Sequence, residues 1–171
     1  MEQQASQSEG SSRTDQLHSG SEQLLQLVSF KIGNEEFGLD ILRVQEIIRV
    51  QDLTRVPNSP DFVDGVINLR GKVIPIIALR KRFGLQQQPP DKQTRIVVLE
   101  VQNMVLGFIV DSVSEVLRIP ATTVAPPPRL GKIEREFVSG VGKLENRLLI
   151  LLDVDRIMGG PEIQACTSAQ A

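Results

Sequence analysis

The stretch that decides the fold is FVDGVINLRGKVIPIIALRKRFG, Phe62 to Gly84. An apolar segment that ends at Leu69 leads into a polar corner, and a second apolar segment, Val73–Leu79, leaves it. Two β-prone runs around a corner that contains glycine predict a β-hairpin. We expect Arg70 at its tip, beside Gly71, which permits a positive φ.

The second half of the chain repeats this stretch. Phe137 to Gly159 reads FVSGVGKLENRLLILLDVDRIMG, at a constant offset of 75 residues (137 − 62 = 75). Further upstream, FGLDILRVQEIIRV at 37–50 matches LGFIVDSVSEVLRI at 106–119, at an offset of 69 (106 − 37 = 69). Two blocks in the same order predict one structural unit that is present twice. The alternative is that β-rich sequences share valine and glycine patterns by chance. The identical pairs are Phe62/Phe137, Val63/Val138, Gly65/Gly140, Val66/Val141, Leu69/Leu144 and Gly84/Gly159, with Gly38/Gly107, Val44/Val113, Glu46/Glu115 and Arg49/Arg118.

The repeat predicts a mainly β protein built from two small barrels of about five strands each. Residues 24–85 are expected to form the first barrel and residues 94–159 the second, with the polar, proline-containing linker 86–93 between them. Units this small bury little surface alone, so we expect them to pack on each other through a shared apolar layer, with edge strands able to cross between barrels. The polar N-terminal extension 1–22 is expected to be disordered and the tail 160–171 to be mobile.

Local patterns add detail to the first copy. The segment Asp40–Arg49 predicts a turn of helix that runs into a strand, and Leu79–Gly84 predicts a short helical turn with a glycine end signal. Pro75 stands where the second copy has Ile150, which indicates an edge or a bulge in the strand, and an accessible rim.

The composition excludes several classes of function. The formal net charge is −2 and the chain has no Trp or Tyr, which disfavours general binding to nucleic acid or to anionic membranes. No apolar run is long enough for direct membrane insertion. Cys166 is the single cysteine, so no intramolecular disulfide can form, and we expect a soluble cytoplasmic protein.

The sequence offers no clear catalytic machinery, phosphate-binding loop, metal-ligand cluster or cofactor site. His18 lies alone in the polar extension. The carboxylate pairs Asp61/Asp64 and Glu134/Glu136 are interpreted as solvated turn residues. The basic run Arg80–Arg82 is interpreted as a solvated face, with contact to an acidic partner as the alternative.

The two hairpin tips differ although the surrounding pattern repeats. The first copy carries Asn68, Arg70 and Gly71, where the second carries Lys143, Glu145 and Asn146. The barrel itself therefore does not require an arginine at the tip. The planar guanidinium of Arg70 suits a carboxylate or carbonyl on a partner, and the alternative is an exposed arginine with only a local turn contact.

At these residues the sequence resembles the CheW family of bacterial chemotaxis coupling proteins, from about Gln26 to Met158. The motifs that carry the resemblance are GLDILRVQEI at 38–47, FVDGVINLRG at 62–71 with VIPIIAL at 73–79, GFIVDSVSEVL at 107–117, and RLLILLDVD at 147–155. The resemblance implies two SH3-like five-stranded β-barrels and a non-enzymatic adaptor without cofactors. Such an adaptor joins the cytoplasmic hairpin tips of transmembrane chemoreceptors to the regulatory domain of the histidine kinase CheA, in receptor arrays at the inner membrane.

The resemblance also implies which residues bind each partner. The receptor-binding residues carried over by motif are Val44, Glu46, Gly65, Asn68 and Arg70. The kinase contact carried over is Gly107 and Val113 in the second copy, although Gly38 and Val44 repeat these positions, so that the needs of the fold also explain them. Two alternatives from other classes stay open: a small β-barrel that binds RNA or ribosomes, and a sensor that holds a small molecule between its barrels.

Overall fold

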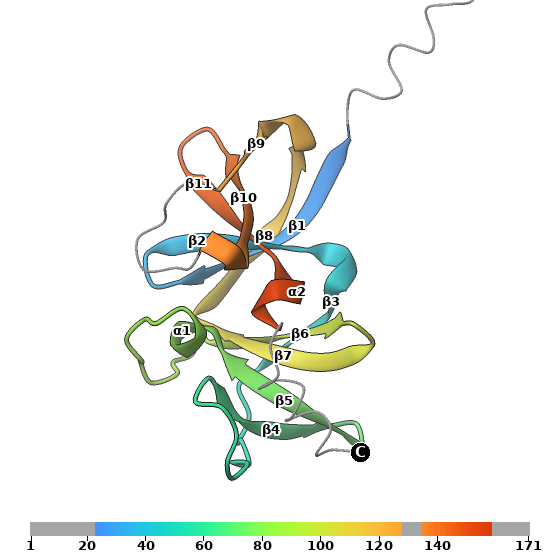
Figure 1. Ribbon diagram of the computed structural model, residues 1–171, viewed down its shortest axis with the longest axis vertical. Helices are drawn as coiled ribbons and strands as arrows, with labels where there is room; N and C mark the ends of the chain where they lie inside the picture. The colour runs from blue at the N-terminus through green and yellow to red at the C-terminus, as the bar shows by residue number, and fades with distance from the viewer. Residues whose placement is uncertain (1–22, 128–134, 159–171) are drawn as a thin grey trace, which may run out of the picture.

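The computed structural model describes residues 23–127 and 135–158, and these form two β-sheets with two short helices (Figure 1). The mainly β fold class is as predicted. The predicted disordered extension and mobile tail lie outside the described residues. The strands are β1 (Leu24–Ile32), β2 (Glu35–Asp40), β3 (Val44–Arg49), β4 (Val63–Leu69), β5 (Lys72–Ala78), β6 (Arg95–Val101), β7 (Met104–Val110), β8 (Ser112–Pro120), β9 (Val124–Ala125), β10 (Val138–Lys143) and β11 (Leu148–Leu152), and the helices are α1 (Leu79–Arg82) and α2 (Val154–Ile157).

Each sheet takes strands from both copies of the repeat. One sheet has the order β8-β1-β2-β11-β10-β9 and the other β3-β6-β7-β5-β4. The first hairpin of each copy, β1–β2 or β6–β7, therefore pairs with the three principal strands of the other copy. We call the first assembly barrel A and the second barrel B. Figure 1 shows them one above the other along the long axis, with α2 between them.

This exchange corrects the predicted division of the chain. The expected barrels were the continuous ranges 24–85 and 94–159, with crossing limited to edge strands. Instead, the complete hairpin β1–β2 of the first copy belongs to barrel A, and the complete hairpin β6–β7 of the second copy belongs to barrel B. The linker 86–93 therefore does not separate the two barrels. The cause is that β1–β2 and β6–β7 are equivalent hairpins, and each can fill the same place in either barrel.

Both barrels close in the same way. In barrel B the segment after β3 returns to β4, where Thr54 and Val66 exchange two backbone hydrogen bonds of 3.0 and 2.8 Å. In barrel A the short strand β9 takes the equivalent place beside β10. Barrel A therefore has a two-residue sixth strand in addition to the five that the repeat predicted.

The shared apolar layer predicted between the barrels is present. All six phenylalanines of the chain are buried in it, and we call it the central core. Separate small clusters fill the barrel interiors, around Ile74 and Ile76 in barrel B and around Leu149 and Leu151 in barrel A. The alternate residues of β11, Ile150 and Leu152, face the central core. This explains why β5 and β11 are apolar on both faces.

Local predictions for the first copy hold with one exception. A 3₁₀ turn at Ile41–Arg43 runs into β3, and α1 ends at Arg82, two residues before Gly84, whose φ is +74°. β5 pairs with β7 only from Ile76 onward, so Pro75 has β4 as its one strand neighbour, as expected at an edge. Pro75 is nevertheless buried, so the rim is not accessible there. Within the described residues, no helix is both long and apolar enough to span a membrane.

Candidate functional site

The hairpin of β4 and β5 ends in the tight turn that the sequence predicted. Leu69 pairs with Lys72, which leaves Arg70 and Gly71 as a two-residue loop with φ values of 52° and 86°. Two successive positive φ angles characterise the type I′ turn that suits the twist of a hairpin. Asn68 steadies the loop, because its Oδ1 accepts a 2.9 Å hydrogen bond from the backbone N–H of Gly71.

Arg70 reaches from the tip to the neighbouring strand β3. Both terminal nitrogens of its guanidinium contact the Glu46 carboxylate. Nη1 lies 2.7 Å from Oε2, and Nη2 lies 3.1 Å from Oε1. The Arg70 side chain is still 74 % exposed, so much of its donor surface faces outward. A surface ion pair adds little stability, but two-point contact fixes the orientation of the guanidinium. The ion pair therefore holds the Arg70 guanidinium in an orientation in which it can bind an acceptor group on another molecule.

Two of the sequence-predicted receptor residues support this site from inside. Gly65 lies in β4 with a φ of 155°, and a Cβ there would come within 2.7 Å of the Thr54 carbonyl oxygen. Val44 is only partly exposed and packs against the central core. Of the five predicted residues, the structure brings Glu46, Asn68 and Arg70 together at the surface, while Gly65 and Val44 shape the barrel beneath them.

Sequence analysis missed two exposed apolar residues on the strands that carry this ion pair. Ile47, next to Glu46, is 40 % exposed, and Val73, at the start of β5, is 52 % exposed. We call the end of barrel B that carries Glu46, Ile47, Arg70 and Val73 face B. Alternation along β3 could have indicated Ile47, because Val44, Glu46 and Ile48 occupy the more buried positions. Exposed apolar groups beside a polar anchor are typical of protein-binding surfaces.

The predicted kinase residues Gly107 and Val113 do not lie on an open surface. Gly107 is buried in β7, and a Cβ there would come within 2.6 Å of Ile96 Cγ2 and 2.8 Å of Ile76 Cδ1. Val113 packs against the central core, as its equivalent Val44 does. Gly107 thus meets a need of the packing, while Val113 packs against the core and is partly exposed.

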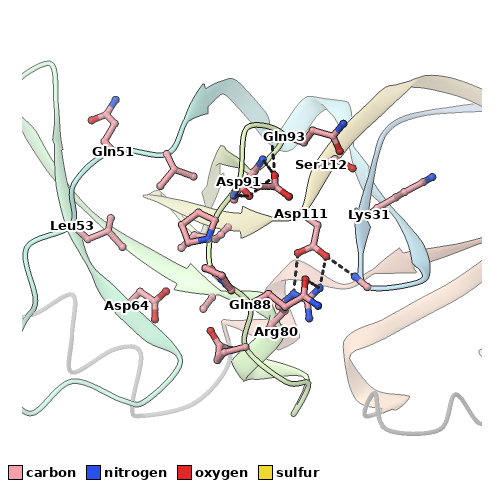
Figure 2. Close-up of a pocket in the computed structure, with 18 of the residues that line it drawn as sticks. Lys31, Gln51, Leu53, Asp64, Arg80, Gln88, Asp91, Gln93, Asp111 and Ser112 are labelled. Atoms are coloured by element: carbon pink, nitrogen blue, oxygen red, sulfur yellow. Dashed lines mark hydrogen bonds and ion pairs between the residues drawn. The ribbon is translucent and has the colours of Figure 1, made fainter.

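A cavity of about 670 Å³ lies where the β1–β2 turn, the linker and barrel B meet (Figure 2). Its walls include Lys31, Leu53, Gln88, Asp91 and Ile109. A cavity of this size can hold a small ligand, which was one open alternative. Its central charged groups, however, are used within the chain.

Arg80 and Asp111 form the principal contact of this cavity, as Figure 2 shows. Arg80 Nε donates to Asp111 Oδ1 at 2.9 Å, and Arg80 Nη1 donates to the Gln86 carbonyl oxygen at 2.7 Å. The backbone N–H of Gly33 donates to Asp111 Oδ2 at 2.7 Å. These bonds join α1, the linker and the β1–β2 turn. The contact thereby fastens the linker across the junction of the two barrels.

The contact between Arg80 and Asp111 shifts the pKa values of both side chains. Partial burial of Asp111 raises its pKa, but the hydrogen bonds from Arg80 and Gly33 and the charge of Arg80 outweigh it, so the pKa of Asp111 lies below its ordinary value. The hydrogen bond to Asp111 raises the pKa of Arg80, against a smaller effect of burial. Both groups are therefore charged at neutral pH.

The basic run 80–82 is not the solvated face that the sequence predicted. Lys81 Nζ lies 2.8 Å from Asp64 Oδ1, and Arg82 donates two hydrogen bonds to the carbonyl oxygen of Ile157. Helix α1 presents these side chains to three different partners, which sequence adjacency could not reveal. Among the described residues, no group of three or more His, Cys, Asp or Glu side chains is placed to hold a metal ion.

Comparison with known proteins agrees with this architecture. A family model described as a CheW-like domain matches residues 26–162. A chemotaxis protein CheW from Klebsiella aerogenes is 42 % identical over 135 residues, which is 78 % of this chain and 81 % of the relative. One from Helicobacter pylori is 38 % identical over 157 residues, 92 % of each chain.

A solved structure shares the fold as well. The crystal structure of the scaffolding protein TtCheW from Thermoanaerobacter tengcongensis superposes with a TM-score of 0.76 at 35 % identity. The match covers 82 % of this chain and 96 % of that protein. The similarity thus extends over nearly all the described residues and includes both barrels.

Proposed function

Because the chain belongs to the CheW-like family, we propose that it is a non-enzymatic adaptor that couples chemoreceptors to the histidine kinase CheA. It acts in receptor arrays at the inner membrane, on the cytoplasmic side. The receptor contributes the cytoplasmic hairpin tip, and the kinase contributes its regulatory domain. Catalysis belongs to the kinase, and the adaptor supplies two binding surfaces.

The observation that carries the receptor assignment is the state of Arg70. Its guanidinium is aligned by Glu46 yet 74 % exposed. The equivalent position of the second copy holds Glu145. The two turns differ in backbone, because Arg70 has a φ of 52° and Glu145 has no positive φ, so the repeat shows only that a hairpin of this kind can close without an arginine at its tip. Arg70 and Glu46 would contact the receptor directly. Asn68, Gly65 and Val44 would act through the turn and the barrel that position them.

Face B also has the charge for an acidic partner. Arg70 and Lys72 bring two positive charges to the end of the β4–β5 hairpin, where the one carboxylate paired with Arg70 is that of Glu46. Such a surface attracts the acidic side chains of a helical hairpin and orients it on approach. Ile47 and Val73 are the exposed apolar residues of the same strands.

Coupling requires the adaptor to bind the two partners at once. If its affinity differs between the kinase's signalling states, receptor occupancy biases the kinase equilibrium by that difference. Each contact can be modest, because repetition of the contacts in an array raises the effective concentration of every partner.

Co-sedimentation with receptor-containing membranes and CheA tests this function, with wild type and Arg70→Glu compared. Wild type is expected to bring kinase to the membrane and raise its activity. Arg70→Glu is expected to bind CheA but to lose the receptor. Lys92→Glu is the control, because it makes the same charge change in the exposed linker. Wild type that binds neither partner would overturn the proposal.

A further inference from the structure

The repeat relates the two sides of the junction between the barrels. Helices α1 and α2 occupy equivalent positions, at an offset of 75 residues (154 − 79 = 75). Each is followed by a buried residue with nearly the same backbone angles, since Phe83 has φ −89° and ψ 0° and Met158 has φ −88° and ψ −8°. The next residue is a glycine in both copies, Gly84 and Gly159. The chain therefore starts away from the two helices in equivalent directions.

After α1, the linker folds back over its side of the junction and is held there by Arg80. Arg80 Nη1 donates to the Gln86 carbonyl oxygen at 2.7 Å, and Arg80 Nη2 donates to Gln88 Oε1 at 3.1 Å. The same guanidinium pairs with Asp111 at the start of β8. Arg80 thus joins Gln88 of the linker to Asp111 of the strand, and all three of these groups are polar.

The other side of the junction has different chemistry at the equivalent positions. Asp155 of α2 takes the place of Arg80 (155 − 75 = 80) and pairs with Arg43 at 3.3 Å, so that α2 lies beside the turn that leads into β3 (Figure 1). Leu42 takes the place of Asp111 (111 − 69 = 42). Its side chain is 88 % exposed, more than any other large apolar side chain among the described residues. A leucine is therefore bare where the first side has a paired carboxylate.

The chain that follows α2 has an apolar residue at the matching position. Thirteen residues follow Met158 (171 − 158 = 13), and Ile163 is the one large aliphatic residue among them. Ile163 takes the place of Gln88 (163 − 75 = 88). Five residues of extended chain span up to about 17 Å, which is enough to reach the turn that α2 already contacts. The two positions that are polar on the first side are thus both apolar on the second.

We propose that residues 159–168 fold back over the second side of the junction, as the linker does over the first, and that Ile163 packs on Leu42. Asp155 is shorter than Arg80 and is already paired with Arg43, so direct apolar burial takes the place of the arginine contact. This inference replaces the sequence-based expectation of a mobile tail. It does not depend on the adaptor function. A partner could reach Leu42 only by displacing the tail.

Methyl NMR of the full chain tests the contact directly. Ile163 and Leu42 are expected to show a methyl–methyl NOE. A sample mixed from isotope-labelled and unlabelled chains distinguishes contact within one chain from contact between two. An NOE found only between chains would mean that a second copy covers Leu42, and the proposal would be wrong. No NOE, with narrow resonances typical of a mobile chain for Ile163, would restore the expected mobile tail.

A double-mutant cycle in the full chain tests the energetics. Leu42→Ser and Ile163→Ser are each expected to lower the urea midpoint by about 0.3 M or more, and the double variant to lower it no further than the larger single effect. Leu148→Ser is the matched control, because Leu148 is a leucine of barrel A that is 59 % exposed. Its effect is expected to be the same with and without Ile163→Ser.

Two results of the cycle contradict the proposal. Additive effects of Leu42→Ser and Ile163→Ser would show that the two side chains do not touch. If Ile163→Ser leaves the midpoint unchanged and Leu42→Ser weakens co-sedimentation with receptor-containing membranes, the receptor and not the tail covers Leu42.

Discussion

Arg70 occupies a backbone conformation that does not favour it. Its φ of 52° lies in the left-handed region, where side chains with a Cβ are strained and Asn or Gly is preferred. Gly71, the next residue, adopts its positive φ without strain, but this does not reduce the strain at Arg70. An arginine at such a place costs stability that Asn or Gly would not cost, which favours a role in binding.

The substitution Arg70→Asn separates turn stability from recognition. Asn-Gly is the preferred pair in a type I′ turn, so the free energy of unfolding should stay unchanged or rise by up to about 1 kcal/mol, even though the Glu46 ion pair is lost. Receptor binding is expected to fall, as is also expected for Arg70→Glu. Denaturant unfolding and receptor co-sedimentation measure the two effects. A drop of more than about 1 kcal/mol would show that the ion pair with Glu46 is structural.

The carboxyl group of Asp111 makes stability at the barrel junction depend on pH. Its pKa is lowered in the folded protein, so its ionised form contributes stability above the unfolded pKa of about 3.9. That contribution is lost as the pH falls through the lower folded value. Asp111→Asn should therefore be less stable than wild type by about 1 kcal/mol at pH 7.

Urea unfolding of both proteins from pH 7 to pH 2 measures this effect. The difference in stability should be constant down to about pH 5 and close below about pH 4. The comparison cancels the titration of carboxylates common to both proteins. A difference that stays the same at pH 2 would mean that packing, and not charge, is what Asp111 contributes.

For single residues, the sequence predicts local geometry but does not predict contacts between residues far apart in the chain. The corner, its glycine and the position of Arg70 follow from neighbouring residues. The pairing of Arg70 with Glu46 joins residues 24 positions apart, and that of Arg80 with Asp111 joins residues 31 apart. Such contacts depend on how barrel strands meet, so the basic run 80–82 was interpreted as solvated although each member has a specific partner.

The two short helices, α1 and α2, are equivalent elements that meet near the centre of the molecule. Arg82 of α1 lies with its guanidinium carbon 4.4 Å from the ring centre of Phe62 and 4.9 Å from that of Phe137. It also donates to the carbonyl oxygen of Ile157, the residue at its own position in the other copy (157 − 75 = 82). One side chain thus joins the C-terminal end of α2 to both repeated phenylalanines.

Arg82→Lys should weaken this contact while it keeps the charge. Lysine lacks the planar group that stacks between two rings and cannot donate two hydrogen bonds to one carbonyl group in the same geometry. We expect a loss of about 1–2 kcal/mol in the free energy of unfolding. Arg49→Lys on the exposed face of β3 is the matched control and should be neutral. Equal stability of Arg82→Lys and wild type would show that the guanidinium is not needed at the junction.

Most elements follow from the sequence because their signals are short-range. Periodicity and end signals predict the turn into β3 and the helix α1 with Gly84 just beyond its end. They also predict that β5 and β11 are apolar on both faces. Strand β9 does not, because two residues in a proline-rich connection form a strand only where β10 is already in place.

The exchange of hairpins makes the whole molecule one folding unit. Cleavage of the linker between Pro89 and Pro90, through an inserted protease site, should therefore not release two barrels. The fragments are expected to co-elute in size exclusion and to unfold in a single transition, because each barrel needs strands from both fragments. Fragments that separate under native conditions, each with its own transition, would contradict the exchanged topology.

The exchange itself was beyond reach of the sequence for a physical reason. β1–β2 and β6–β7 present the same apolar pattern, so pairing within a copy and pairing between copies bury equivalent residues. Local propensity is the same for both arrangements. Only the contacts of the linker and the central core distinguish them, and those exist only in the folded molecule.

The exchanged pairing also sets native folding against the direction of protein synthesis. As the nascent chain leaves the ribosome, β1–β2 is the first hairpin that β3, β4 and β5 encounter, yet their native partner β6–β7 emerges later. Barrel B can close once Val110 has emerged, while β1–β2 must wait for β11, which ends at Leu152. If β1–β2 pairs first with β3, β4 and β5, that pairing must be replaced before the native state forms, and this replacement is where we expect slow maturation and capture by chaperones.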